Sequence, residues 1–264
     1  MSLSLRQQRI LKQATLKGQV SVEVLVEQFE VTPQTIRKDL TALCDADYLV
    51  RVHGGAVLES GVANVGYEQR RTIASEHKKE LARLCARQIP DKSSLFINIG
   101  TTTEAVAEAL LNHKDLMVVT NNLNVANILI QNPSFEVIVA GGALRHSDRA
   151  IIGEATVDFV RQFRLDYAVI GISALDEDGT LLDYDYREVR VAQAILESAR
   201  NCFLVTDTTK LERNAPVKVG HISQLKALFI DELKSAPLTE ACQQHDVDIF
   251  TLDNIALANQ DTTT

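Results

Sequence analysis

The sequence predicts an α/β protein of two domains, in which a small helical domain precedes a larger domain with a mainly parallel sheet. Its 264 residues are long enough for two domains of average size. Hydrophobic residues make up 45% of the chain and charged residues 23%, which is typical of a folded globular protein and excludes wholesale disorder. Three amphipathic helical patterns open the chain, whereas apolar strand-like runs alternate with helical stretches from residue 94 onward.

The first three predicted elements are short helices, each with one apolar face. The first covers residues 5–16, and the second follows Ser21, whose hydroxyl is a good N-cap. The third begins at Thr32 as its N-cap, with Pro33 at the first helical position, where the missing N–H costs nothing. Apolar residues recur at the spacing of one buried face, and in the second and third helices they are Val22, Leu25, Val26, Phe29, Ile36, Leu40 and Leu43.

The third helix also has a polar face. At about 100° per residue, Gln34, Lys38 and Thr41 point away from the apolar stripe, and Thr35 and Arg37 flank them. Short hydrogen-bonding groups near the helix start, followed by cations, suit a helix that enters the major groove of DNA. In that position the first turn reaches base edges and the cations bind phosphates.

Residues 48–58 hold two β-rich runs separated by His53-Gly54-Gly55, which predicts a hairpin. A hairpin directly after such a helix is the wing of a winged helix-turn-helix domain, where Arg51 and His53 are placed to contact the DNA backbone or minor groove. The alternative is a small helical bundle whose polar residues are merely solvated. The residues predicted to contact DNA are Thr32, Gln34, Thr35, Arg37, Lys38, Thr41, Arg51 and His53.

The distribution of charge separates the two predicted domains. The whole chain has a formal net charge of −8, which taken alone argues against nucleic-acid binding. Residues 1–58, however, hold seven Lys or Arg and six Asp or Glu, a net charge of +1, which leaves −9 on the remaining residues. The phosphate backbone of DNA interacts with the local charge of the surface that it contacts. The net charge of the whole chain therefore does not exclude a DNA-binding domain.

The expected domain limits are 1–58 for the winged helix-turn-helix, 59–75 for a linker, 76–252 for the α/β domain and 253–264 for a tail.

No apolar run approaches the roughly 18 residues of a membrane span, and the start lacks a secretory signal pattern, so a cytoplasmic protein is expected. The four cysteines form no CxxC pair and the histidines show no zinc spacing, so structural thiols and no metal site are expected.

The larger domain is predicted from strands and helices that alternate along the chain, which indicates a parallel sheet covered by helices. Asp185, with Glu188 three positions later, is expected to cap one of these helices as a capping pair. The expected strands cover 94–99, 117–120, 136–140, 166–170, 202–206, 227–230 and 247–252, and the expected helices 101–111, 122–131, 154–163 and 186–199.

Ligands of such sheets bind beyond the carboxyl ends of the strands, so these ends are the candidate binding residues. Gly100 and the following three threonines offer backbone amides, hydroxyls and a helix N-terminus, which suits a phosphate. The alternative for these threonines is ordinary N-capping. Asp207 either orients Lys210 or binds a ligand hydroxyl. The predicted effector-binding residues are Gly100, Thr101, Thr102, Thr103, Asn121, Asn122, Gly141, Gly142, Asp207 and Lys210.

Residues 32–40 (TPQTIRKDL) and 51–56 (RVHGGA) resemble the DNA-binding domain of the DeoR family of bacterial transcription regulators. Residues 95–102, 118–127, 152–156 and 162–166 are similar to its sensor domain. The resemblance implies a sensor with the fold of sugar-phosphate isomerases and a repressor of a carbon-metabolism operon. It also implies operator double-stranded DNA as partner, glycerol 3-phosphate or another phosphorylated sugar as effector, and a homo-oligomer, either dimer or tetramer. No cofactor, metal, catalytic residue or membrane is implied.

The alternative function is a sugar-phosphate isomerase. In that case Lys210 and an acid such as Asp183 or Glu188 would transfer protons. The N-terminal domain argues against this alternative because an enzyme has no need of it.

Overall fold

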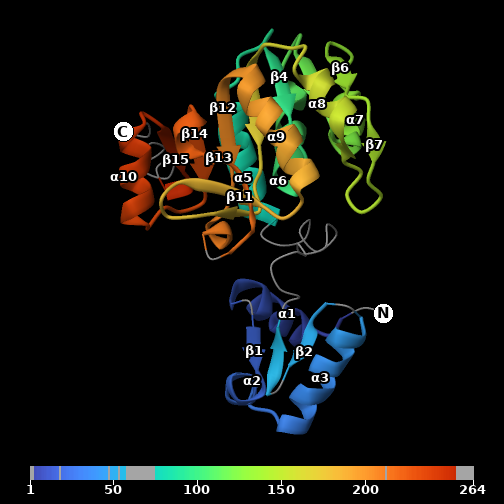
Figure 1. Ribbon diagram of the computed structural model, residues 1–264, viewed down its shortest axis with the longest axis vertical. Coiled ribbons are helices and arrows are strands. Elements are labelled where there is room, and N and C mark those ends of the chain that lie inside the picture. Colours follow the sequence, from blue (N-terminus) through green and yellow to red (C-terminus); the bar gives the residue numbers. More distant parts are fainter. Residues whose placement is uncertain are drawn as a thin grey trace, which may run out of the picture. The chain divides into compact units, whose positions relative to one another are not determined.

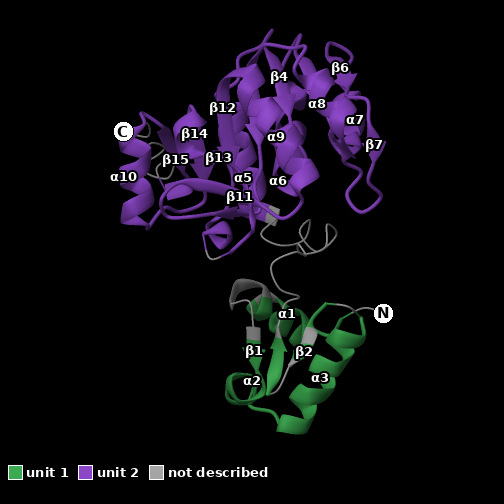
Figure 2. Ribbon diagram, viewed as in Figure 1, with its two compact units in different colours: residues 1–65 green, residues 66–264 purple. Residues whose placement is uncertain are grey.

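The computed structural model describes residues 3–17, 19–46, 48–52, 54–57, 75–211 and 213–253. The chain divides into two compact units, Met1–Val65 and Gly66–Thr264 (Figure 2). Residues 59–74 of the expected linker (59–75) and residues 254–264 of the expected tail (253–264) lie outside the described residues.

The N-terminal unit has the predicted three helices and hairpin (Figure 1). Ser21 and Thr32 cap the second and third helices as expected, each accepting a hydrogen bond from a backbone amide three residues later. Its elements are α1 (Leu5–Lys17), β1 (Gln19–Ser21), α2 (Val22–Phe29), α3 (Pro33–Asp45), β2 (Val50–Val52) and β3 (Gly55–Val57). In the described part of the unit, the strands form an antiparallel sheet in the order β1-β3-β2, in which β1 was not predicted.

The core of this unit is built from the predicted helical stripes. Ile36, Leu40 and Leu43 of α3 are fully buried against Ile10 of α1 and Leu25 of α2. At about 25 cal/mol per Å² of apolar surface, burial of these side chains is the main force that holds the three helices together. The polar face of α3 is thereby turned outward.

The C-terminal unit is an α/β domain on a parallel sheet, as predicted (Figure 1). In residues 75–211 and 213–253 this sheet has seven strands in the order β15-β14-β12-β9-β4-β5-β6. Their bounds are β4 (Ser94–Ile97), β5 (Met117–Thr120), β6 (Glu136–Val139), β9 (Leu165–Ile170), β12 (Ala199–Val205), β14 (Ala227–Ile230) and β15 (Asp248–Thr251). Chain order reverses direction between β4 and β9, which makes this pair the switch point of the sheet.

Helices cover both faces of the sheet. One core packs α5, α6 and α7 against the sheet, and the other packs α8, α9 and α10 against the opposite face. Along β12, Cys202 and Leu204 belong to one core and Phe203 and Val205 to the other, as expected for a strand that is buried on both faces. The helices are α5 (Ser75–Ala86), α6 (Thr101–Ala109), α7 (Leu123–Leu129), α8 (Glu154–Val160), α9 (Tyr186–Ser198) and α10 (Ala236–Gln244).

Several short elements of this unit were not predicted. The strands β7 (Ala143–Leu144) and β8 (Ile151–Ile152) form a hairpin. A small antiparallel sheet has the order β10-β11-β13, with bounds Ala174–Leu175, Thr180–Asp183 and Val217–His221. Single 3-10 turns are η1 (Leu110–Asn112), η2 (Thr208–Lys210) and η3 (Ile222–Gln224).

The cysteines are free thiols, as expected. Cys85, Cys202 and Cys242 are buried, and burial raises the pKa of Cys202 and of Cys242 to about 11. A thiol with so high a pKa is neutral at physiological pH and packs as a small apolar group.

Across the described ranges, no helix combines the length and the apolar character that crossing a membrane requires.

Candidate functional site

The exposed face of α3 carries the residues predicted to contact DNA. Gln34, Arg37, Lys38 and Thr41 are exposed, and Thr35 is half-buried. The hairpin β2–β3 follows this helix, so the unit is not a bundle of helices alone. The helix therefore presents hydrogen-bonding groups and cations on one accessible side.

Asp39, in the middle of α3, is directed away from that face. It is 6% exposed, and its carboxylate accepts hydrogen bonds from Arg6 Nε at 2.5 Å and Gln7 Nε2 at 3.2 Å. These bonds fasten α3 to α1 and offset a negative charge that would weaken phosphate binding beside it. The neighbouring Arg37 and Lys38 consequently dominate the potential of the exposed face.

The remaining residues predicted to contact DNA are Thr32, Arg51 and His53. Thr32 is exposed, but its hydroxyl caps α3 and hydrogen-bonds the hydroxyl of Thr35 at 2.9 Å. Arg51 is exposed on β2. His53 lies outside the described residues.

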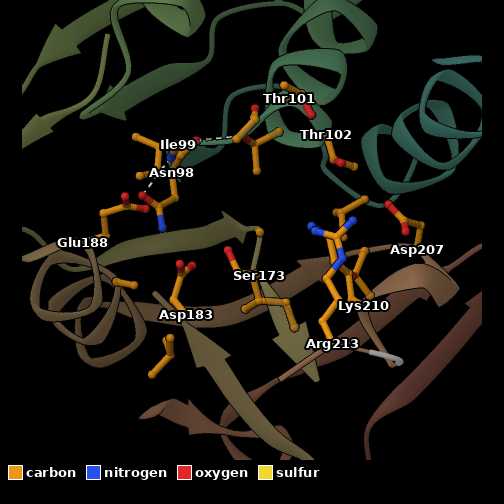
Figure 3. A pocket seen from close by; sticks show the side chains of 18 of the residues that line it. Asn98, Ile99, Thr101, Thr102, Ser173, Asp183, Glu188, Asp207, Lys210 and Arg213 are labelled. Atoms are coloured by element: carbon orange, nitrogen blue, oxygen red, sulfur yellow. Dashed lines mark hydrogen bonds between the residues drawn. The ribbon is translucent and has the colours of Figure 1, made fainter. Parts of the chain in front are cut away.

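A pocket lies beyond the carboxyl ends of β4, β9 and β12 (Figure 3). Residues 98–103 follow β4, residues 171–173 follow β9, and residues 206–210 follow β12. Because β4 and β9 flank the switch point, the loops that follow them separate and leave a crevice. The pocket therefore lies where an open α/β sheet binds its ligands.

One side of the pocket suits an anion. Thr101 and Thr102 open α6, whose N-cap is Gly100, so no side chain caps its first amides. Lys78 of α5 is 6% exposed and donates a hydrogen bond from Nζ to Thr101 Oγ1 at 3.2 Å. Lys210, 9% exposed, joins these residues in the lining. Helix amides, hydroxyls and ammonium groups are the kinds of group that suit a phosphate.

Arg213 belongs to the same side of the pocket, where Figure 3 shows it next to Lys210 and Asp207. It donates a hydrogen bond from Nη2 to Thr209 Oγ1 at 3.4 Å. The Asp207 carboxylate caps η2 by accepting a bond from the Thr209 amide at 3.1 Å, and it also accepts one from the hydroxyl of Thr209. Asp207 thus orders the turn that carries Lys210.

The opposite side of the pocket is acidic. Asp183 and Glu188 lie there in Figure 3, and Asp148 also belongs to the lining. Arg145, in the loop of the β7–β8 hairpin, donates hydrogen bonds to Glu188 and Asp148 and to Asp185 Oδ2 at 3.1 Å. Asp185 caps α9 as expected, whereas Glu188 binds Arg145 in place of the predicted capping pair.

Burial, together with the charge of Asp183, raises the pKa of Glu188 to about 7 even though Arg145 opposes the shift. The folded protein therefore holds a proton on Glu188 more tightly than the unfolded chain does.

The free energy of unfolding should depend on pH through this residue. Between the ordinary pKa of a glutamate and about 7, the folded state binds more protons than the unfolded state, so stability falls as pH rises through this range. In Glu188→Gln this contribution is lost, and the unfolding free energy should fall less between pH 5 and pH 8. Urea unfolding of the variant and of wild type at pH 5 and at pH 8 measures this difference. Glu197→Gln, an exposed position on the same helix, should keep the wild-type dependence. Identical curves for Glu188→Gln and wild type would refute the assignment.

The structure gathers six of the ten predicted effector residues in this pocket, namely Gly100, Thr101, Thr102, Thr103, Asp207 and Lys210. Thr103 is fully buried, and its hydroxyl donates to the carbonyls of Asn98 and Gly100, both at 2.8 Å. Thr103 thus binds backbone carbonyls and does not act as the N-cap that was its alternative role.

Asn121, Asn122, Gly141 and Gly142 do not line the pocket. Asn121 and Asn122 follow β5, on the far side of β4 from the switch point, and both are fully buried. The β7–β8 hairpin covers them: the Ile151 amide donates to Asn121 O at 2.7 Å, and Asn121 Nδ2 donates to Ile151 O at 3.1 Å. Asn122 caps α7. Through these contacts Asn121 binds the hairpin, and Asn122 begins α7.

Gly142 also has a structural role at this junction. Its φ is +153°, and a Cβ at this position would come within 2.2 Å of Thr156 Oγ1 and 2.9 Å of the Ile152 carbonyl oxygen. Gly142→Ala should therefore lower the free energy of unfolding by about 1–3 kcal/mol, the usual cost of overpacking. Gly141→Ala is the matched control, since a Cβ there meets nothing within 4 Å. Urea unfolding compares them, and equal stability of the two variants would contradict this role.

Among the polar residues that line the pocket, the sequence did not point to Lys78, Asn98, Asp148 and Arg213. One of them carried a readable signal. Lys78 lies at the helical spacing of Leu81, Ala82 and Cys85, all of them buried, so the sequence places a lysine on the apolar face of α5. Burying a lysine in an apolar stripe costs free energy unless its charge has a partner. A lysine at such a position therefore indicates a binding site.

A winged helix-turn-helix joined to an α/β domain with a pocket at its switch point defines a DNA-binding regulator with a sensor domain. Residues 6–61 match the DeoR-like helix-turn-helix domain, and residues 73–232 match the DeoR C terminal sensor domain. The chain belongs to the DeoR family of transcriptional regulators.

Named relatives agree with this assignment. The chain is 48% identical over 244 residues to the glycerol-3-phosphate regulon repressor of Escherichia coli (strain K12), covering 92% of this chain and 97% of that protein. It is 50% identical over 233 residues to the protein of the same name from Haemophilus influenzae, covering 88% and 91%. Relatives named as repressors support a regulator and not the alternative enzyme.

Among solved structures, ribose 5 phosphate isomerase A from Neisseria gonorrhoeae matches 53% of this chain and 55% of its own, at 14% identity and a TM-score of 0.38. A likeness this distant carries no argument about function.

Proposed function

We propose that this chain is a cytoplasmic repressor of a carbon-metabolism operon that binds operator DNA through α3 and the β2–β3 wing. A phosphorylated metabolite in the sensor pocket lowers its affinity for the operator. Glycerol 3-phosphate is the first candidate for this effector, because the relatives described above are named as repressors of the glycerol-3-phosphate regulon.

The observation that carries the proposal is the anion side of the pocket. Lys78 and Lys210 are both more than nine-tenths buried. Lys78 binds the hydroxyl of Thr101 at the N-terminus of α6, and Lys210 lines the same pocket. Amides at a helix start and compact cations recognise phosphate together, and a buried site of this kind excludes the water that would compete for them. A phosphate offers these ammonium groups a negative charge, whereas a neutral sugar offers them only hydroxyls.

The operator contacts follow from the chemistry of the α3 face. Gln34 at the first turn is placed to pair with adenine, and Arg37 and Lys38 with guanine or with phosphates. Thr32, Thr35, Thr41, Arg51 and His53 complete the proposed surface. One such domain reads one half-site, and two half-sites one helical turn apart, roughly 34 Å, require two copies. We therefore include a homo-oligomer, a dimer or tetramer, in the proposal.

A mobility shift with the DNA upstream of the chain's own gene tests this function. The full chain should retard that DNA, and glycerol 3-phosphate should release it, whereas glycerol at the same concentration should not. Other sugar phosphates in parallel reactions identify the effector if it is not glycerol 3-phosphate. Retardation that no phosphorylated metabolite alters would contradict the proposal, and so would the absence of any sequence-specific shift.

A further inference from the structure

The pocket has two sides of opposite charge. Figure 3 shows Lys210 and Arg213 on one side, and Asp183 and Glu188 on the other. The cations and the carboxylates are clearly separated in this view, so they lie on different sides of the pocket. A ligand that spans the pocket therefore meets cations at one end and carboxylates at the other.

The carboxylates are held in place from outside the pocket. Arg145 does not belong to the lining, yet it binds Glu188, Asp148 and Asp185. Asp183 Oδ1 accepts a bond from the Tyr184 amide at 2.7 Å. An ionised carboxylate accepts hydrogen bonds from hydroxyls because its oxygens are acceptors only. Its negative charge repels a second anion.

A further group in the lining indicates that a polar ligand belongs here. Thr206, which follows β12, is 2% exposed, and within the described residues its hydroxyl has no hydrogen-bond partner. A buried hydroxyl without a partner is costly unless a ligand or water satisfies it.

We propose that Asp183 and Glu188 make the pocket selective for monophosphorylated polyols and sugars, and that they exclude compounds carrying a second anionic group at the far end. This inference rests on the proposed function, since it assumes that a phosphate occupies the cationic end. The hydroxyl-bearing end of the effector donates hydrogen bonds to the two carboxylates. A carboxylate or second phosphate in its place meets like charge.

Calorimetric titration of the full chain at pH 8 with two matched ligand pairs tests this selectivity. Glycerol 3-phosphate and 3-phosphoglycerate differ in whether the far carbon is a hydroxymethyl or a carboxylate. Fructose 6-phosphate and fructose 1,6-bisphosphate differ by one phosphate. In whichever pair binds, the dissociation constant of the doubly anionic member should be at least about tenfold higher.

Variants assign the effect to the two carboxylates. Asp183→Asn and Glu188→Gln should each reduce the ratio of dissociation constants within a pair several-fold, by improving the binding of the doubly anionic member. Glu197→Gln, exposed on the same helix as Glu188, should leave the ratio unchanged.

The outcomes separate this inference from the proposed function. If the monophosphates bind and their doubly anionic partners bind equally well, the selectivity is wrong and the repressor function stands. If wild type discriminates and both variants discriminate as strongly, the assignment to these residues is wrong. If no phosphorylated ligand binds at millimolar concentration, the proposed effector site and the inference fall together.

Discussion

Replacing Thr102 by glutamate should abolish the response to the effector while operator binding persists. Thr102 lies at the start of α6 on the cationic side of the pocket, where the new carboxylate would take the place of the phosphate. Repulsion between carboxylate and phosphate at close range costs several kcal/mol, so the dissociation constant for glycerol 3-phosphate should rise about 100-fold or more. An acidic residue in the first turn of a helix is otherwise favourable, so the fold should tolerate it.

Titration of the operator-bound protein with effector, followed by fluorescence anisotropy of labelled DNA, measures this loss. Thr102→Ser is the matched control, because it retains the hydroxyl and should respond like wild type. A Thr102→Glu protein that still releases DNA at the wild-type effector concentration would move the phosphate site away from α6.

Removing the cations of α3 should weaken operator binding without disturbing the fold. Arg37 and Lys38 are exposed, so alanine at either position creates no cavity. Each phosphate contact that is lost lowers the slope of log K against log salt by about one unit, and we expect about a tenfold loss of affinity per substitution at moderate salt. The double variant should lose more than either single one.

A salt series by fluorescence anisotropy checks both quantities. Lys114→Ala removes the same charge from an exposed position of the C-terminal unit and should change neither affinity nor slope. If Arg37→Ala and Lys38→Ala behave like Lys114→Ala, α3 does not lie on the DNA.

The strands of the large sheet were predictable because they are buried on both faces and therefore appear as continuous apolar runs. The predicted limits of β5 and β14 agree with the structure at both ends. The two-residue strands β7, β8 and β10 were not predictable, since two residues show no periodicity. Strand β1 has three residues and is recognisable only from its pairing with β3.

The binding residues were predicted in part because the sequence reveals where strands end but not how they are ordered. The ends of β4 and β12 lie beside the pocket, and the end of β5 does not, although Asn121 and Asn122 have suitable chemistry. Strand order and the hairpin that covers Asn121 depend on pairing between distant segments. Lys78 reaches the pocket from a helix, outside any strand end.

We expect effector and operator to bind to states of this protein that disfavour each other. Thermodynamic linkage makes that coupling reciprocal, so calorimetric titration of glycerol 3-phosphate, or the effector identified above, into free and operator-saturated protein measures it directly. We expect weaker effector binding to the operator-saturated protein, by the same factor by which the effector weakens operator binding, about 5–150-fold. Equal effector affinity for the two forms would contradict it.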